Sequence, residues 1–157
     1  MIRYDAGVVN ETPQAMVIDA KVRLSGTEAP SIQIGNVKQL EDYVRPMIAD
    51  CAAEEFHLIC VNTQCMVLAE ACVGSGTVGE VAAPLAKIAQ IALLSNATAV
   101  FLAHNHPGGT CAPSFEDQTS TITISKALKL FDIKVLDHII VTNHNGSYSF
   151  AQHGDSL

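Results

Sequence analysis

Two histidines and an aspartate, separated by a short loop containing two glycines, have the types and spacing needed to bind a metal ion. His104 and His106 lie two residues apart at the end of an apolar run, and Asp117 follows beyond the loop. In an extended strand, side chains two residues apart point to the same side, so both imidazoles leave the strand together. Pro107 favours this, because a residue that precedes proline is held in the extended region. Two imidazoles and one carboxylate suit Zn²⁺ with a fourth position left for water, as in catalytic zinc sites.

The same residues also have an interpretation that needs no metal. Ser114 and Asp117 have the spacing of a capping pair, with serine at the N-cap of a helix and an acid three residues later. An H-x-H pair in a loop occurs often by chance. The metal interpretation is favoured by the combination of an apolar strand ending in H-x-H-P, a glycine loop and S-x-x-D at a helix start, because these are several independent constraints.

The complete pattern, H-x-H followed by seven residues and then S-x-x-D, resembles the JAMM signature of the MPN family of metallopeptidases, and all four positions match. Three further segments, EEFHLICVNTQ, FLAHNHPGG and LDHIIV, are similar to segments of RadC-type bacterial proteins. The resemblance runs over most of the chain, from Val37 to Phe150. It implies a cytidine-deaminase-like three-layer fold and a Zn²⁺-dependent hydrolase that cleaves a peptide or isopeptide bond.

The resemblance also implies roles for individual residues. His104, His106 and Asp117 would bind Zn²⁺, and a glutamate at an earlier strand entrance would act as general base. The matching position is Glu54, with Glu55 as the alternative, because Glu54 lies two residues before a phenylalanine, as in the E-x-F of RadC sequences. Such a carboxylate can take a proton from water and pass it to the leaving amine. Ser114 would donate a hydrogen bond to the developing oxyanion. Without the resemblance, both glutamates would be interpreted as solvated residues at a helix end.

The elements that must position these residues follow from apolar periodicity and from turn and cap residues. Strands are predicted at residues 15–24, 31–34, 56–61, 65–73, 98–103, 135–141 and 148–150. Helices are predicted at residues 36–53, with Asn36 as N-cap, and at 81–94 and 114–131. This order indicates an α/β fold, a mixed sheet with helices packed on it. We expect one domain, residues 15–157, after a flexible arm of residues 1–14.

Composition narrows the class of protein. With 48% hydrophobic and 16% charged residues, no apolar run long enough for a membrane and no signal peptide, we expect a soluble cytoplasmic protein without a membrane partner. Five cysteines without a C-x-x-C pair suggest reduced thiols. A net charge of −7 and no basic patch make nucleic acid a poor partner, so we expect a protein or peptide substrate. Neither the natural substrate nor the oligomeric state follows from the sequence.

Two other functions compete with hydrolysis. One is a non-catalytic MPN scaffold, and retention of every motif residue argues against it. The other is a role near nucleic acid through the DNA-repair association of RadC, but the chain lacks the N-terminal helical region of full-length RadC proteins and has Gly108-Gly109 where they commonly have Ser-Gly. Core, surface or turn roles are expected for the histidines that match no motif spacing, and Cys111 has no partner base. These histidines are His57, His138, His144 and His153.

Overall fold

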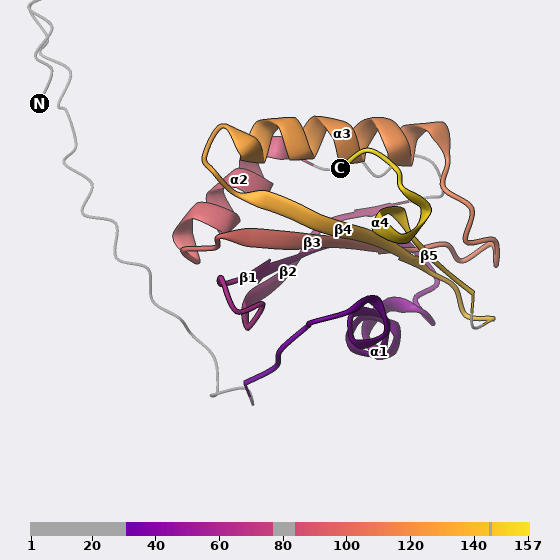
Figure 1. The fold of residues 1–157 in the computed structure, drawn as a ribbon. Coiled ribbons are helices and arrows are strands. Elements are labelled where there is room, and N and C mark those ends of the chain that lie inside the picture. Colours follow the sequence, from indigo (N-terminus) through magenta and orange to yellow (C-terminus); the bar gives the residue numbers. More distant parts are fainter. Residues whose placement is uncertain (1–30, 77–83, 145) are drawn as a thin grey trace, which may run out of the picture.

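The computed structural model describes residues 31–76, 84–144 and 146–157, which form three layers around a five-stranded sheet (Figure 1). The strands are β1 (Glu54–Val61), β2 (Val67–Gly76), β3 (Ala99–Asn105), β4 (Lys134–Val141) and β5 (Ser147–Ser149). The helices are α1 (Val37–Ile48), α2 (Leu85–Leu94), α3 (Phe115–Lys129) and α4 (Phe150–His153). The sheet order is β2-β1-β3-β4-β5, with β3 and β4 parallel and all other neighbours antiparallel. The predicted α/β fold with helices packed on a mixed sheet is confirmed.

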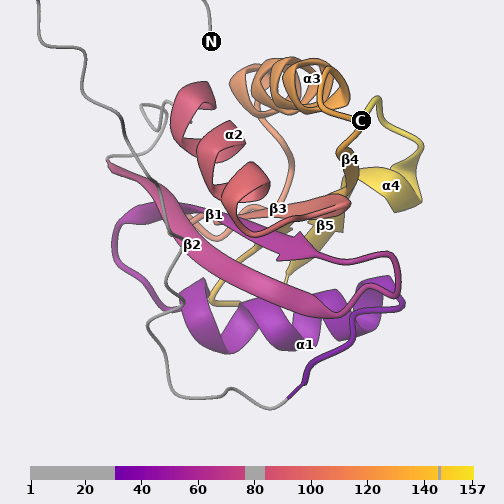
Figure 2. The ribbon, with the colours of Figure 1, turned by 90° about the vertical axis from the view of Figure 1, so that its left-hand side faces the viewer.

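Helix α1 covers one face of the sheet, and α2 and α3 cover the other (Figure 2). The central strand β3 is buried along its whole length, which explains its continuous apolar sequence. Strand β1 supplies both cores by alternation: Phe56 and Leu58 pack towards α2 and α3, whereas Ile59 and Val61 pack towards α1. Consecutive residues of β1 therefore serve opposite faces of the sheet.

Helix α1 begins as predicted, because the side chain of Asn36 accepts the main-chain N–H three residues later at 2.9 Å. It ends at Ile48 instead of continuing to residue 53. The reason is tertiary: the side-chain amide of Asn105, at the end of β3, donates to the carbonyls of Cys51 and Ala53 at 3.1 and 3.0 Å. These bonds hold the connection to β1 in a non-helical path, and β1 starts two residues earlier than predicted.

Two other predicted strands are altered. Residues 31–34 form only an isolated bridge, between Gln33 and Met66, and no regular strand. The strand predicted at 148–150 ends at Ser149, because its hydroxyl caps the short helix α4 and also donates to Asp137 at 2.6 Å. The prediction that Phe150 ends a strand was therefore wrong, since this residue begins α4.

Some predictions fall on residues outside the described ranges. These are the strand at 15–24, the arm at 1–14 and the first residues of the helix predicted to begin at 81. The described part of that helix begins at Leu85 and ends at Leu94 as expected, with Asn96 at a left-handed φ of 52° just beyond it. Among the helices that the structure describes, none is both long and apolar enough to cross a bilayer.

Candidate metal centre

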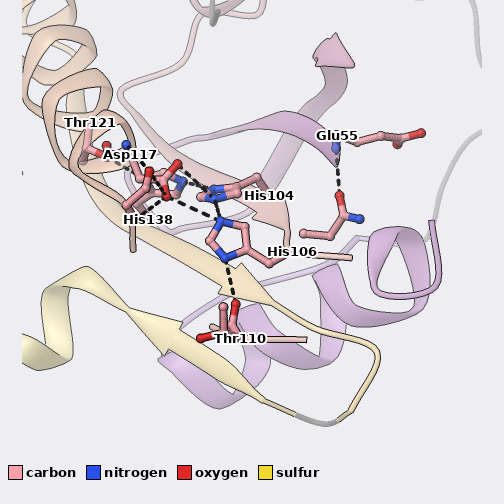
Figure 3. Close-up of polar contacts among 9 residues, drawn as sticks. Glu55, His104, His106, Thr110, Asp117, Thr121 and His138 are labelled. Atoms are coloured by element: carbon pink, nitrogen blue, oxygen red, sulfur yellow. Dashed lines mark hydrogen bonds and ion pairs between the residues drawn. The ribbon is translucent and has the colours of Figure 1, made fainter. Parts of the chain in front are cut away.

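His104 and His106 leave the end of β3 on the same side, as strand alternation predicts, and their Nε2 atoms lie 2.9 Å apart (Figure 3). His106 continues the extended path by one residue, because its main-chain N–H donates to the carbonyl of Val141 in β4 at 3.0 Å. The His104 ring is fully buried and stacks on Phe56 of β1, with ring centroids 5.9 Å apart. The sheet thus fixes the direction of both rings.

Asp117 lies in the first turn of α3 and reaches both histidines (Figure 3). Its Oδ1 is 3.2 Å from Nε2 of His104, and its Oδ2 is 3.5 Å from Nε2 of His106. The predicted capping box is also present. Ser114 Oγ accepts the Asp117 N–H at 3.0 Å, and Asp117 Oδ2 accepts both the N–H and the hydroxyl of Ser114 at 2.7 Å. The cap therefore aims the Asp117 carboxylate at the histidines, so capping and convergence are not alternatives.

A chain of hydrogen bonds behind His104 determines which of its nitrogens faces Asp117 with a free lone pair. The Thr121 hydroxyl donates to the main-chain oxygen of Asp117 at 2.6 Å, so its oxygen must accept from Nδ1–H of His138, also at 2.6 Å. Nε2 of His138 is then an acceptor for Nδ1–H of His104, at 2.7 Å. The Nε2 of His104 is therefore unprotonated and available to a metal ion.

The donor atoms suit a zinc ion in both chemistry and spacing. His106 Nδ1 donates to the Thr110 carbonyl at 2.8 Å, which leaves its Nε2 unprotonated as well. Two nitrogen lone pairs 2.9 Å apart, beside carboxylate oxygens, repel one another unless a cation lies between them. Zinc–ligand bonds of about 2.0–2.1 Å at tetrahedral angles place ligand atoms about 3.3 Å apart. The distances of 2.9, 3.2 and 3.5 Å among His104, His106 and Asp117 lie around that value.

Glu54 completes the group from the first position of β1. It is buried, and it offers a carboxylate oxygen to a set in which all ligand atoms lie within 4.8 Å of one another. We call Glu54, His104, His106 and Asp117 the β3–α3 cluster. Glu55 points to the other face, and its N–H donates to Oδ1 of Asn105 at 2.7 Å (Figure 3). Of the two glutamates that the sequence left open, the structure brings Glu54 to the histidines.

Charges within the cluster favour an ionised carboxylate. Burial alone would raise the pKa of Asp117, but when a proton occupies Nε2 of His104 or His106 in place of a cation, its hydrogen bond to the carboxylate holds this pKa well below its usual range. In that metal-free, protonated form, the hydrogen bond with Asp117 raises the pKa of His106 against the opposing effect of burial. Burial lowers the pKa of His138, and a proton on His104 would lower it further. His138 is therefore neutral, which its place in the hydrogen-bond chain requires.

Sequence reasoning missed the supporting groups His138, Thr121 and Asn105. His138 is a core residue, one of the roles expected for it, but it also contacts His104 directly. One signal was present, because His138 belongs to the RadC-like LDHIIV segment in a strand that is buried on both faces. Cys111 is half-buried in the loop between the histidines and α3, outside the β3–α3 cluster.

Comparisons with known proteins identify the family to which the chain is similar. The family model described as "RadC-like JAB domain" matches residues 34–155. The chain is 35% identical over 138 residues to UPF0758 protein YfjY of Escherichia coli, which covers 88% of this chain and 82% of YfjY. It is 34% identical over 125 residues to UPF0758 protein YkfG of the same organism, covering 80% and 78%. A UPF0758 protein of Cupriavidus pinatubonensis is 32% identical over 94% of this chain, which spans 61% of that longer relative.

Proposed function

The chain belongs to the RadC-like JAB domain family, and from this membership we propose that it is a Zn²⁺-dependent hydrolase acting on a peptide or isopeptide bond of a protein or peptide. The observation that carries the proposal is the convergence of Glu54, His104, His106 and Asp117 within 4.8 Å. Three of them would supply the two nitrogens and one carboxylate of a catalytic zinc site, and the fourth would be an additional carboxylate beside it.

His104, His106 and Asp117 would hold the ion, through the two Nε2 atoms and the Asp117 carboxylate. When bound there, Zn²⁺ would supply a Lewis acid that polarises a carbonyl and acidifies a water molecule. The residues behind the ligands keep the donor atoms ready. His138 keeps the proton of His104 on Nδ1, and the carbonyl of Thr110 does the same for His106.

Glu54 is the general base in this proposal. Its carboxylate would take a proton from water and later pass it to the leaving nitrogen, so that the amine departs neutral. The position supports the role, because Glu54 is buried beside the ligand atoms while its own main chain is part of β1. The Asn105 side chain fixes the start of this strand through the N–H of Glu55 and the carbonyl of Ala53.

Ser114 would donate a hydrogen bond to the developing oxyanion. In the structure its hydroxyl donates to Asp117 Oδ2 and accepts from the Asp117 N–H. To act on a substrate, the hydroxyl must turn its proton from Asp117 towards the oxyanion. The main-chain N–H of Ser114 would still hold the carboxylate of Asp117 in place during that turn.

The proposal is tested by metal removal and replacement on the full chain. A library of peptides and isopeptide-linked peptides is screened with zinc-loaded protein, and the hydrolysed substrate is assayed again after chelation. We expect loss of hydrolysis on chelation and recovery on adding Zn²⁺. The His106→Ala variant should remain inactive with zinc, whereas the control His153→Ala, an exposed histidine of α4, should remain active.

A different result would favour the scaffold function. If the wild type binds one zinc ion per chain more than His106→Ala does, but no peptide or isopeptide bond is cleaved, the metal assignment holds and the hydrolase proposal fails. If zinc binding is the same in both proteins, the ligand assignment itself is wrong.

A further inference from the structure

A second group of side chains of the types that bind metal ions lies on the opposite face of β1. Glu55 and His57 alternate with Glu54 along the strand, so they point towards the layer that contains α1. Cys72 of β2 is paired directly with His57 in the antiparallel register. The donor atoms of Glu55, His57 and Cys72 all lie within 4.8 Å of one another. We call these three residues the β1–β2 cluster.

The register of the hairpin produces this grouping. The β1–β2 ladder shifts between Phe56 and His57, so that Phe56 pairs with Gly74 and His57 with Cys72. Directly opposed residues of an antiparallel pair place their Cβ atoms about 4.5–5.5 Å apart on one face. The shift therefore turns the Cys72 thiol and the His57 ring to the same side, within reach of one ion.

His57 has the hydrogen bonding of a metal-bound histidine. Its Nδ1 lies 2.6 Å from Oε1 of Glu70, and its Nε2 lies 3.0 Å from Oε2 of Glu55. A histidine that binds metal through one nitrogen almost always donates the other N–H to a carboxylate, a main-chain carbonyl or water. Glu70 is placed to accept Nδ1–H, which directs Nε2 to Glu55. The position between Nε2 and Glu55 can then hold either a proton or a metal ion.

The donor set and its exposure suit a divalent ion of the zinc class. Thiolate, imidazole and carboxylate are the donors that Zn²⁺ takes in proteins. The side chains of Glu55 and Glu70 are 29% and 30% exposed and Cys72 is exposed, so an ion can enter from solvent, while His57 is only 9% exposed. Lys87 contacts the main-chain oxygens of Cys72 and Val73 and not the donor atoms.

We propose that the β1–β2 cluster is a second cation site, in which Glu55, Nε2 of His57 and the thiolate of Cys72 bind a zinc-class divalent ion and Glu70 orients His57. This site is separate from the β3–α3 cluster, because the two lie on opposite faces of the sheet and share no residue. It does not depend on the hydrolase proposal.

The proposal is tested with Co²⁺ as a spectroscopic substitute for zinc on the full chain. The β3–α3 cluster contains no sulfur, so thiolate-to-cobalt charge-transfer absorption in the near ultraviolet cannot arise from that cluster. We expect this band in the wild type and in His106→Ala, and its loss in Cys72→Ser. Cys65→Ser is the matched control and should keep the band, because Cys65 lies at the other end of the hairpin.

Further variants keep the test decisive. Glu55→Gln should weaken Co²⁺ binding at this site, and Glu70→Ala should weaken it by about 10- to 100-fold, the usual cost of losing a partner of a ligating histidine. Both residues are partly exposed, so neither change threatens the fold. Absence of a thiolate band in the wild type, or a band that persists in Cys72→Ser, would overturn the proposal. Loss of the band in His106→Ala would show that one site had been mistaken for two.

Discussion

Adjacent residues of one strand, Glu54 and Glu55, open onto two clusters that the protein holds in different ways. In the β3–α3 cluster the ligands are fixed by groups outside it: His138 supports His104, and the cap at the start of α3 supports Asp117. Removing a cation would leave these supports in place. The β3–α3 cluster is therefore preorganised.

In the β1–β2 cluster, the position of the side chains depends on a positive charge that balances the carboxylates. His57 is held by the carboxylates of Glu55 and Glu70, and these bonds are strong only while a proton or a metal ion lies among them. The Cys72 thiol donates a hydrogen bond to the main-chain oxygen of Gly74 at 3.3 Å. Burial and supporting hydrogen bonds suit the β3–α3 cluster to catalysis. The greater exposure of the β1–β2 cluster suits it to reversible uptake of an ion.

The largest effect is expected for Glu54→Gln. Loss of a positioned general base should lower hydrolysis by about 10²- to 10⁴-fold, while zinc binding by His104, His106 and Asp117 is retained. Hydrolysis rates and zinc titrations check this, with Glu116→Gln as control, because Glu116 carries the same charge on an exposed position of α3. Full activity in Glu54→Gln together with loss in Glu55→Gln would exchange the functions assigned to the two faces.

Ser114→Ala should have the next largest effect. Loss of one oxyanion donor costs about 10²- to 10³-fold in rate, and loss of the N-cap hydroxyl costs about 1 kcal/mol of stability. Ser114→Thr keeps a hydroxyl at the cap and should restore most of both losses. Rate measurements and thermal unfolding separate the two contributions. Unchanged hydrolysis in Ser114→Ala would confine Ser114 to capping.

His138→Leu should weaken zinc binding at the β3–α3 cluster by about 10- to 100-fold, because His104 loses the partner that keeps its proton on Nδ1. His138→Gln should recover part of the affinity, since its side-chain oxygen can accept the same N–H. Competition with a chromogenic chelator measures both variants. Equal affinity for His138→Leu and the wild type would show that the sheet alone orients His104.

The smallest expected effect is on stability in the metal-free protein. Burial opposes protonation of His57, but hydrogen bonds to Glu70 and Glu55 outweigh it and raise its pKa. A raised folded-state pKa stabilises the protein below the unfolded value of about 6.5, and this contribution is lost as pH rises through the folded value. His57→Gln should therefore lower the free energy of unfolding more at pH 5.5 than at pH 9. The difference between the two losses should be less than about 1 kcal/mol. Denaturant unfolding at the two pH values checks the sign.

Sequence reasoning succeeded where the signal lies within one element or between neighbours in the chain. Strand alternation places His104 and His106 on the same side, and the capping pattern places Asp117 in the first turn of α3. The helix and strand types were also correct for most described elements, because their apolar periodicity is strong.

What sequence reasoning missed depends on pairing between distant segments. His138 meets His104 only because β4 runs parallel to β3 in a register that pairs it with Leu102. The early end of α1 depends on Asn105, more than 50 residues away. Likewise, the β1–β2 cluster depends on the irregular pairing of His57 with Cys72. No pattern within a short stretch of sequence predicts how these distant strands pair.

The capping box at the start of α3 has a kinetic consequence. Because the amide and hydroxyl of Ser114 already hold the Asp117 carboxylate in its final direction, no segment must fold before the β3–α3 cluster can receive an ion. Refilling after chelation should then proceed in a single exponential phase whose rate is proportional to the free zinc concentration. The ion could then leave and return without any refolding of the site at each exchange.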